Sequence, residues 1–191
     1  MSGDEREKNT VFREVQRFHQ WWIYLVVLAV TLFAWYAPLR QLFADRPPGE
    51  KEAPDWFMYL VWLLMGMGFP ALFLSARLVV EVRDDGIHYR YHPFHLRFHR
   101  IGVEEIEEAE ARTYRPVLEY GGWGIRYGRK GKAYNVSGNR GVQLRLRDGR
   151  RVLFGSQRAE EFASALQEVM ASPRRPREGG APSGGQGAPM R

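Results

Sequence analysis

The stretch that decides the fold is residues 78–92, LVVEVRDDGIHYRYH. It starts as an apolar-rich run, turns at Asp84-Asp85-Gly86, and then alternates between apolar and polar side chains over residues 87–92. An Asp-Gly pair between two such runs is a strong signal for a β-hairpin. The sequence therefore predicts that a strand-rich unit begins here.

Downstream of this hairpin the alternation continues and then gives way to a helical pattern. Phe162, Leu166 and Val169 lie at positions i, i+4 and i+7, which predicts one apolar stripe on a helix from about Arg158 to Met170. Ser156 is a suitable N-cap for that helix. The further predicted strands are residues 96–101, 106–113, 123–127, 133–136, 142–146 and 150–155.

Upstream of the hairpin lie two long apolar segments, residues 18–39 and 56–76. The first would span roughly 33 Å as a helix, against a hydrocarbon core of about 30 Å, and it has aromatic residues near both ends. Both segments are predicted to be transmembrane helices. Pro70, with Gly66 and Gly68 before it, predicts a bend in the second one.

The distribution of positive charge predicts an orientation for these spans. Four Lys/Arg residues precede Phe18, three lie between the spans, and the remaining 21 follow Ala76. Because Lys and Arg accumulate on the cytoplasmic side, both termini are expected in the cytoplasm. The expected location is the inner (plasma) membrane of a bacterial cell, with two passes.

The 191 residues divide into four predicted parts. Residues 1–17 form a cytosolic head, residues 18–76 a transmembrane helical hairpin, and residues 77–170 the strand-rich domain. Residues 171–191 are rich in Gly and Pro and are expected to be a disordered tail. The chain has no cysteine, which excludes disulfides, thiolate metal sites and cysteine nucleophiles. Its net charge of +6 favours an acidic partner.

About seven short strands followed by one helix are typical of a pleckstrin-homology (PH)-like barrel or sandwich. The pattern VEVRDDGIHYRYHP…IEEAEARTYRPVLEYGGWGIR…GKAYNVSGNRGVQL…DGRRVLFGSQ resembles a family of small, uncharacterised bacterial membrane proteins with two spans and a cytosolic PH-like domain. The resemblance implies an α+β fold with an N-terminal transmembrane hairpin, and it implies no activity. Many PH domains bind phosphoinositides through a basic first hairpin. Here that hairpin is short and acidic, so the resemblance does not extend to such a site.

The most glycine-rich stretch is residues 119–144, EYGGWGIRYGRKGKAYNVSGNRGVQL. A Walker loop needs a glycine five residues before its Gly-Lys pair, but Arg126 stands there before Gly131-Lys132. The dinucleotide fingerprint fails as well, because its last glycine would fall on Tyr127. The stretch instead predicts a β-hairpin with a basic tip. The candidate contacts for anionic lipid or an acidic partner are Arg126, Arg129, Lys130 and Lys132.

Two other clusters of polar residues stand out in the sequence. His88, His92, His95 and His99 could meet across a hairpin, but the arginines among them disfavour a bound cation. The glutamates at 104–110 indicate a solvated edge or a docking surface. No catalytic arrangement, metal site or cofactor site is predicted.

These patterns predict a membrane-anchored binding or scaffolding protein without catalytic activity, presenting a PH-like domain at the cytosolic face. The alternative is an accessory subunit of a larger membrane complex that binds its partner through the spans. The expected partners are anionic lipid headgroups and a protein whose identity the sequence does not give. Nucleic acid is disfavoured because no recognised nucleic-acid module is present.

Overall fold

The protein is described by a computed structural model that covers residues 10–43, 55–128 and 130–172. The strands are β1 (Thr10–Arg17), β2 (Arg77–Arg83), β3 (Gly86–His92), β4 (His99–Gly102), β5 (Ile106–Thr113), β6 (Gly124–Gly128), β7 (Gly131–Asn135), β8 (Arg140–Leu146) and β9 (Arg151–Gly155). The helical segments are α2 (Trp21–Phe43), α3 (Asp55–Val61), η1 (Trp62–Gly68), α4 (Phe69–Ser75), η2 (Val103–Glu105), α5 (Pro116–Tyr120) and α6 (Ala159–Ala171).

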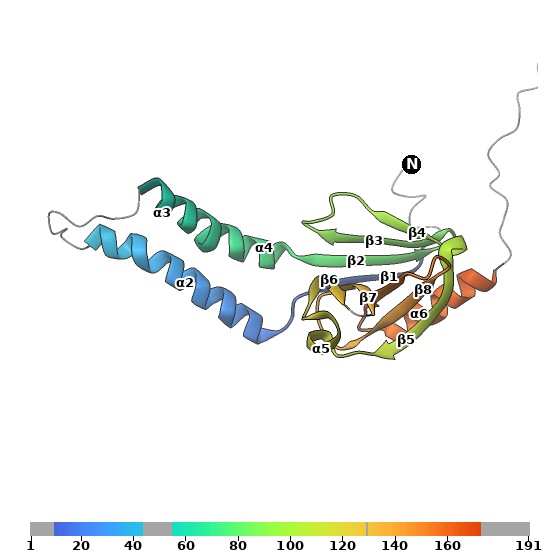
Figure 1. Cartoon of the computed structure of the whole chain (residues 1–191). Helices are drawn as coiled ribbons and strands as arrows, with labels where there is room; N and C mark the ends of the chain where they lie inside the picture. The colour runs from blue at the N-terminus through green and yellow to red at the C-terminus, as the bar shows by residue number, and fades with distance from the viewer. Residues whose placement is uncertain (1–9, 44–54, 129, 173–191) are drawn as a thin grey trace, which may run out of the picture.

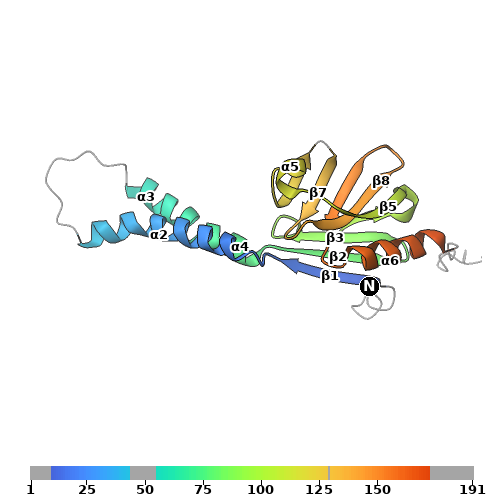
Figure 2. The same ribbon diagram turned by 90° about the horizontal axis from the view of Figure 1, so that it is seen from below.

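Two sheets and α6 enclose the core. The first sheet has the order β1-β2-β3-β4 and the second the order β5-β8-β9-β7-β6, in which β7 and β9 run parallel. Figure 1 shows α2 lying beside α3 and α4 as an arm that projects from one end of the sheets, and Figure 2 shows the same arrangement from below. Side chains from both sheets and from α6 form one apolar cluster, with Phe162 and Leu166 fully buried.

Strand β1 joins the N-terminal segment to the sheet. Residues 10–17, part of the predicted cytosolic head, pair antiparallel with β2. Phe12 stacks on Phe162 of α6 with ring centroids 5.2 Å apart. The buried Glu14 accepts hydrogen bonds from Ser156 Oγ (2.5 Å) and from the Gln157 N–H (2.8 Å). The arm is therefore an insertion between two neighbouring strands of one sheet.

The predicted membrane spans, residues 18–39 and 56–76, are wrong. Within the described residues, no helix is both long enough and apolar enough to cross a membrane. Phe18 is buried in the core ahead of α2. Helix α2 begins only at Trp21, so the first three residues of the predicted span, 18–20, lie outside it. The second segment consists of three successive helical segments of seven residues each.

Three further predictions rested on those spans and are corrected with them. These are the multi-pass location in a bacterial inner membrane, the membrane-anchored scaffold, and the accessory subunit that binds through its spans. The fold class is α+β with two sheets, and none of the helices in the described residues could form the predicted transmembrane hairpin. The arm nevertheless exposes large apolar side chains, with Phe33 81% exposed.

Much of the predicted local structure is confirmed. The hairpin of β2 and β3 turns at Asp84-Asp85, and the glycine-rich stretch forms the antiparallel hairpin of β6 and β7. Helix α6 lies within one residue of its predicted bounds. Its N-cap is Arg158, because Ser156 Oγ is instead shared between Glu14 and the Arg158 N–H. Ala171 ends α6, and the rest of the predicted tail beyond Ser172 lies outside the described residues.

The arm is irregular where the bend was predicted. Residues Trp62–Gly68 are π-helical, and α4 follows with Pro70 in its first turn. Proline lacks an N–H and its ring clashes with the carbonyl four residues earlier, which disfavours a regular α-helix through this point. Gly66 lies beside Trp35 of α2, where an added Cβ would come within 3.3 Å of the indole nitrogen. The irregular turn therefore sits where the two helices of the arm approach closely.

Candidate functional site

The basic residues predicted at the hairpin tip do not form one patch. Arg126 Nε donates to the Trp123 carbonyl at 3.0 Å. Lys130 Nζ forms an ion pair with Glu119 at 3.2 Å. Lys132 Nζ lies 4.8 Å from the Tyr134 ring centroid and 5.1 Å from that of Tyr127. Arg129 lies outside the described residues.

Glu119 ties the tip to the second sheet. It accepts a hydrogen bond from Arg112 at 2.9 Å and one from the Arg115 N–H at 2.8 Å. Partial burial alone would raise the pKa of Glu119, but these bonds and that of Lys130 lower it to about 2. Lys130 also borders a small polar cavity of about 260 Å³ on this sheet. The carboxylate therefore neutralises part of the positive charge that the sequence placed at the tip.

Arg126 borders a larger and mostly apolar cavity at the base of the arm, of about 740 Å³. Its walls come from α2, α4, the end of β3 and the segment between α5 and β6. Aromatic contacts hold these walls together. The rings of Trp22 and Trp123 lie 5.9 Å apart, and those of Phe18 and Phe73 lie 5.6 Å apart. The cavity therefore lies where the arm meets the sheets.

Local sequence explains how the segment after α5 reaches this cavity. Gly121 ends α5 in the left-handed conformation, with φ of 72°. Its N–H bonds to the Val117 carbonyl at 2.9 Å, which closes the last turn. The chain then turns back, and the Trp123 indole donates to the Gly138 carbonyl at 2.9 Å. This bond fixes the ring as one wall of the cavity.

The lining of the cavity includes the charged side chain of Arg126 and the phenol of Tyr91. Tyr91 is almost fully buried, and its hydroxyl has no hydrogen-bond partner among the described residues. Burial raises the pKa of Tyr91, and the charge of Arg126 offsets that shift only in part. The hydroxyl therefore stays protonated at neutral pH and can donate a hydrogen bond into the cavity, beside a permanent positive charge.

The histidines are divided between two places. The rings of His95 and His99 lie 4.3 Å apart between centroids, tilted to each other, beside Tyr89. His88 contacts Asp85 at 2.8 Å instead. Within residues 10–43, 55–128 and 130–172, no three potential ligand side chains gather in a way that could hold a metal ion. The absence of a metal, a cofactor and catalysis remains a prediction.

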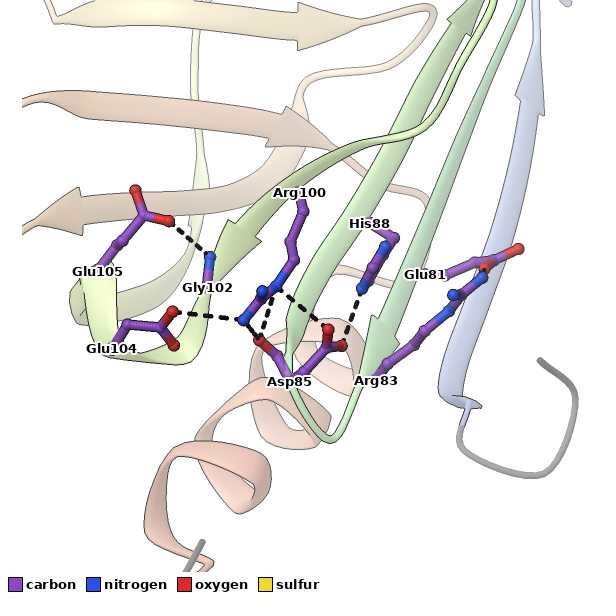
Figure 3. A network of polar contacts seen from close by, with 8 residues as sticks. All are labelled: Glu81, Arg83, Asp85, His88, Arg100, Gly102, Glu104 and Glu105. Atoms are coloured by element: carbon purple, nitrogen blue, oxygen red, sulfur yellow. Dashed lines mark hydrogen bonds and ion pairs between the residues drawn. The ribbon is translucent and has the colours of Figure 1, made fainter. Parts of the chain in front are cut away.

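The glutamates after β4 are partly paired within the fold. Arg145 contacts Glu107 at 3.2 Å and Glu108 at 3.0 Å, and Glu104 contacts Arg100 at 3.3 Å. Glu105 accepts a hydrogen bond from the Gly102 N–H at 2.9 Å. Figure 3 shows Glu104 and Glu105 beside the β2–β3 turn, where Asp85 contacts both His88 and Arg100. Glu104 and Glu105 therefore support the turn end of the first sheet, whereas Glu107 and Glu108 pair with Arg145 within the second sheet.

Sequence reasoning missed the cavity. Its walls come from segments that are far apart in the chain, and Phe18, Trp22 and Phe73 had been assigned to membrane spans. Only the EYGGWGIR block, with Trp123 and Arg126, lay within a predicted site. An aromatic residue among three glycines was the available signal, because the glycines permit a compact turn that places the ring.

The chain belongs to a family of unknown function, DUF6141, whose profile matches residues 4–173. That range runs from before β1 to beyond α6, so the match includes both the arm and the two sheets. No curated protein and no solved structure matches the chain. The family match agrees with the expected membership of an uncharacterised family, and it contains no information on a PH-like domain or on spans.

Proposed function

We propose that the protein is a non-catalytic binding protein for an amphipathic molecule with an apolar chain and an anionic end group. The cavity at the base of the arm holds this ligand. The single observation that carries the proposal is a mostly apolar cavity of about 740 Å³ whose lining, within the described residues, includes one charged side chain, Arg126, and the Tyr91 phenol. Ligand sites are typically mostly apolar concavities of about 300–1,000 Å³ with a few placed polar groups.

The walls select an apolar chain. Phe69, Phe73 and Leu72 of α4 face Trp22 and Val26 of α2 across the cavity. Each CH₂ group that enters such a space contributes about 0.8 kcal/mol by leaving water. A long-chain ligand therefore gains far more from these walls than a short-chain one.

The polar groups select the end group. Arg126 is exposed at the rim, so its guanidinium can bind a carboxylate or another oxyanion while remaining hydrated. The Tyr91 hydroxyl can donate a second hydrogen bond to the same anion. Neither side chain, as placed, has a base or nucleophile partner that would support covalent chemistry. Binding without turnover therefore fits this pair.

Binding of a fluorescent long-chain carboxylate to the full chain tests the proposal. The competitors are an unlabelled carboxylate of the same length, the alcohol of that length and a short-chain carboxylate. We expect the long carboxylate to compete best and the short one to compete poorly. Arg126→Gln should remove most of the preference for carboxylate over alcohol, because the alcohol does not use the guanidinium charge.

A bulky substitution inside the cavity supplies the decisive control. Leu72→Trp places an indole in the space between α2 and α4, whereas Leu74→Trp changes an exposed residue of the same helix. We expect the first variant to lose binding and the second to keep it. Equal binding by both variants would show that the probe sits on the exposed surface of the arm, and the proposal would then fail.

A further inference from the structure

The outer face of the first sheet, the face turned away from the second sheet, carries a row of basic side chains at its arm end. Across β1, β2 and β3, Arg17 is directly opposite Arg77, and Arg77 is directly opposite His92. Residues opposite each other in antiparallel strands have Cβ atoms about 5 Å apart on the same face. These three side chains, named the basic row, therefore lie side by side.

The basic row has no counter-charge in the described part of the chain. Neither Arg17 nor Arg77 forms an ion pair there, and the Nε of Arg77 is buried without a hydrogen-bond acceptor. Arg90 lies diagonally adjacent on β3, and its buried Nε also lacks an acceptor. Like charges directly opposite each other destabilise a sheet, and an unsatisfied buried donor adds a further cost.

The opposite end of the same face shows that the fold can satisfy such charges. Glu81 forms ion pairs with both Arg13 and Arg83. Near the β2–β3 turn, Arg100 contacts Asp85 (Figure 3). Arg13 and Arg17 come from the same strand and the same face. Among the described residues, the arginines at the arm end have no acidic partner.

We infer that the basic row, together with Arg90, binds a phosphate group. Guanidinium groups present planar forks that match phosphate oxygens with two hydrogen bonds each. Two guanidinium groups about 5 Å apart can bind one phosphate from two sides, and His92 adds a third donor when its ring N–H faces the row. The Phe98 ring, 4.8 Å from the Arg90 guanidinium carbon, holds that side chain over the sheet.

This site is separate from the cavity and extends the function beyond the proposed amphipathic ligand. The neighbours of the row, Phe18, Ala76 and Tyr91, point to the inner side of the sheet and line the cavity. Alternation along each strand places the two sets on opposite faces. Loss of one site therefore leaves the other intact, and the two proposals can fail independently.

Calorimetric titration of the full chain with inorganic pyrophosphate tests the site. We expect Arg17→Gln and Arg77→Gln each to weaken binding about tenfold, which is the loss of one charge-assisted contact of about 1.4 kcal/mol. The matched control is Arg13→Gln, which removes the same charge from the same strand and face. It should bind within about twofold of the parent protein, since its partner is Glu81.

Thermal unfolding without anion supplies a second reading that also monitors folding. Arg77→Gln should unfold at an equal or higher temperature than the parent, because it relieves repulsion within the row. Arg77→Lys keeps the charge without the fork and should bind with intermediate affinity. If Arg13→Gln weakened pyrophosphate binding as much as Arg77→Gln, the effect would come from overall charge and the inference would be overturned. The absence of any pyrophosphate binding would overturn it as well.

Two further titrations identify the source of the phosphate. One uses glycerol phosphate, and the other uses phosphatidylglycerol vesicles with phosphatidylcholine vesicles as the uncharged control. Binding that depends on Arg77 only with vesicles assigns the phosphate to a lipid headgroup. The same dependence only with glycerol phosphate assigns it to a water-soluble compound. If neither probe binds in an Arg77-dependent way, the site is not a phosphate site.

Discussion

The turn end and the arm end of the first sheet use the same three strands and similar side chains, yet they balance charge in opposite ways. At the turn end, Glu81 is only 5% exposed and is paired with two arginines. At the arm end, Arg17 and Arg77 face each other without an acid in the described residues. Proteins keep unfavourable local arrangements mainly at functional sites. The difference therefore separates a part of the sheet that stabilises the fold from a part that is free to bind.

The comparison depends on β1, so the largest expected effect comes from removing that strand. A fragment of residues 77–172 lacks Phe12 and leaves Ser156 and Gln157 without the Glu14 carboxylate. Burying one large apolar side chain contributes about 1.5–3 kcal/mol, and each buried hydrogen bond to a charged group adds about 1.5–3 kcal/mol. A loss of about 5 kcal/mol or more exceeds the stability of a marginal domain. We expect undispersed amide signals in its proton NMR spectrum.

A chimera gives the matched comparison for that fragment. Because Arg17 and Arg77 are directly opposite, an Asn-Gly turn can join β1 to β2 in place of the arm. This chain should fold and show dispersed signals. If the fragment without β1 folded, the first sheet would be stable without the strand that supplies both Arg13 and Arg17. The comparison of its turn end with its arm end would then not explain its stability.

The sequence predicted short-range structure well, because turns and alternation depend on neighbouring residues. Asp85-Gly86 specified the first hairpin, and the stripe containing Phe162 and Leu166 specified α6. The glycine-rich hairpin was also predictable, since glycine readily adopts the positive φ of a tight turn, as Gly131 does with φ of 101°. These features require no knowledge of distant partners.

Long-range pairing was not predictable from the same patterns. The segment TVFREVQR alternates, but its partner strand lies 60 residues further along the chain, beyond the arm, so it was assigned to a head. The basic row follows from that pairing and was missed with it. Charge counts placed the site at the hairpin tip, but they do not show that Glu119 neutralises Lys130 there.

At the turn end, replacing the shared carboxylate should convert a satisfied cluster into an unsatisfied one. Glu81→Gln leaves Arg83, whose side chain is 12% exposed, without its counter-charge. Removing one partner of a largely buried pair costs about 3–5 kcal/mol, and the exposure of Arg13 reduces this to about 2–3 kcal/mol here. Urea unfolding measures the change. Glu107→Gln, at an exposed ion pair, should cost less than about 0.5 kcal/mol. Equal losses of stability in Glu81→Gln and Glu107→Gln would contradict the view that the Glu81 cluster stabilises the fold.

At the arm end, supplying a carboxylate should make the basic row resemble the turn end. Arg17→Glu places an acid directly opposite Arg77 on an exposed position. Replacing a repulsive cross-strand pair with an attractive one should stabilise the protein by about 0.5–1 kcal/mol in urea unfolding. Pyrophosphate binding should be lost at the same time. A variant that is stabilised yet binds pyrophosphate as the parent does would show that the row is not the binding site.

The smallest expected effect is a difference in acid sensitivity between the two ends. Burial alone would raise the pKa of Asp85, but the hydrogen bond to His88 and the charges of His88 and Arg100 lower it below the ordinary 3.8. A carboxyl whose pKa is lower in the folded state contributes stability above its unfolded pKa, and loses it as pH falls through the folded value. The side chain is 42% exposed, so the contribution lies within the range of about 0.2–1 kcal/mol for exposed pairs. Urea unfolding at neutral pH and below about pH 3.8 should show a smaller acid-induced loss for Asp85→Asn than for the parent. Asp84→Asn, at the exposed neighbouring turn position, should lose as much stability in acid as the parent does. Identical pH profiles of stability for the two variants would show that Asp85 does not contribute to the charge balance of the turn end.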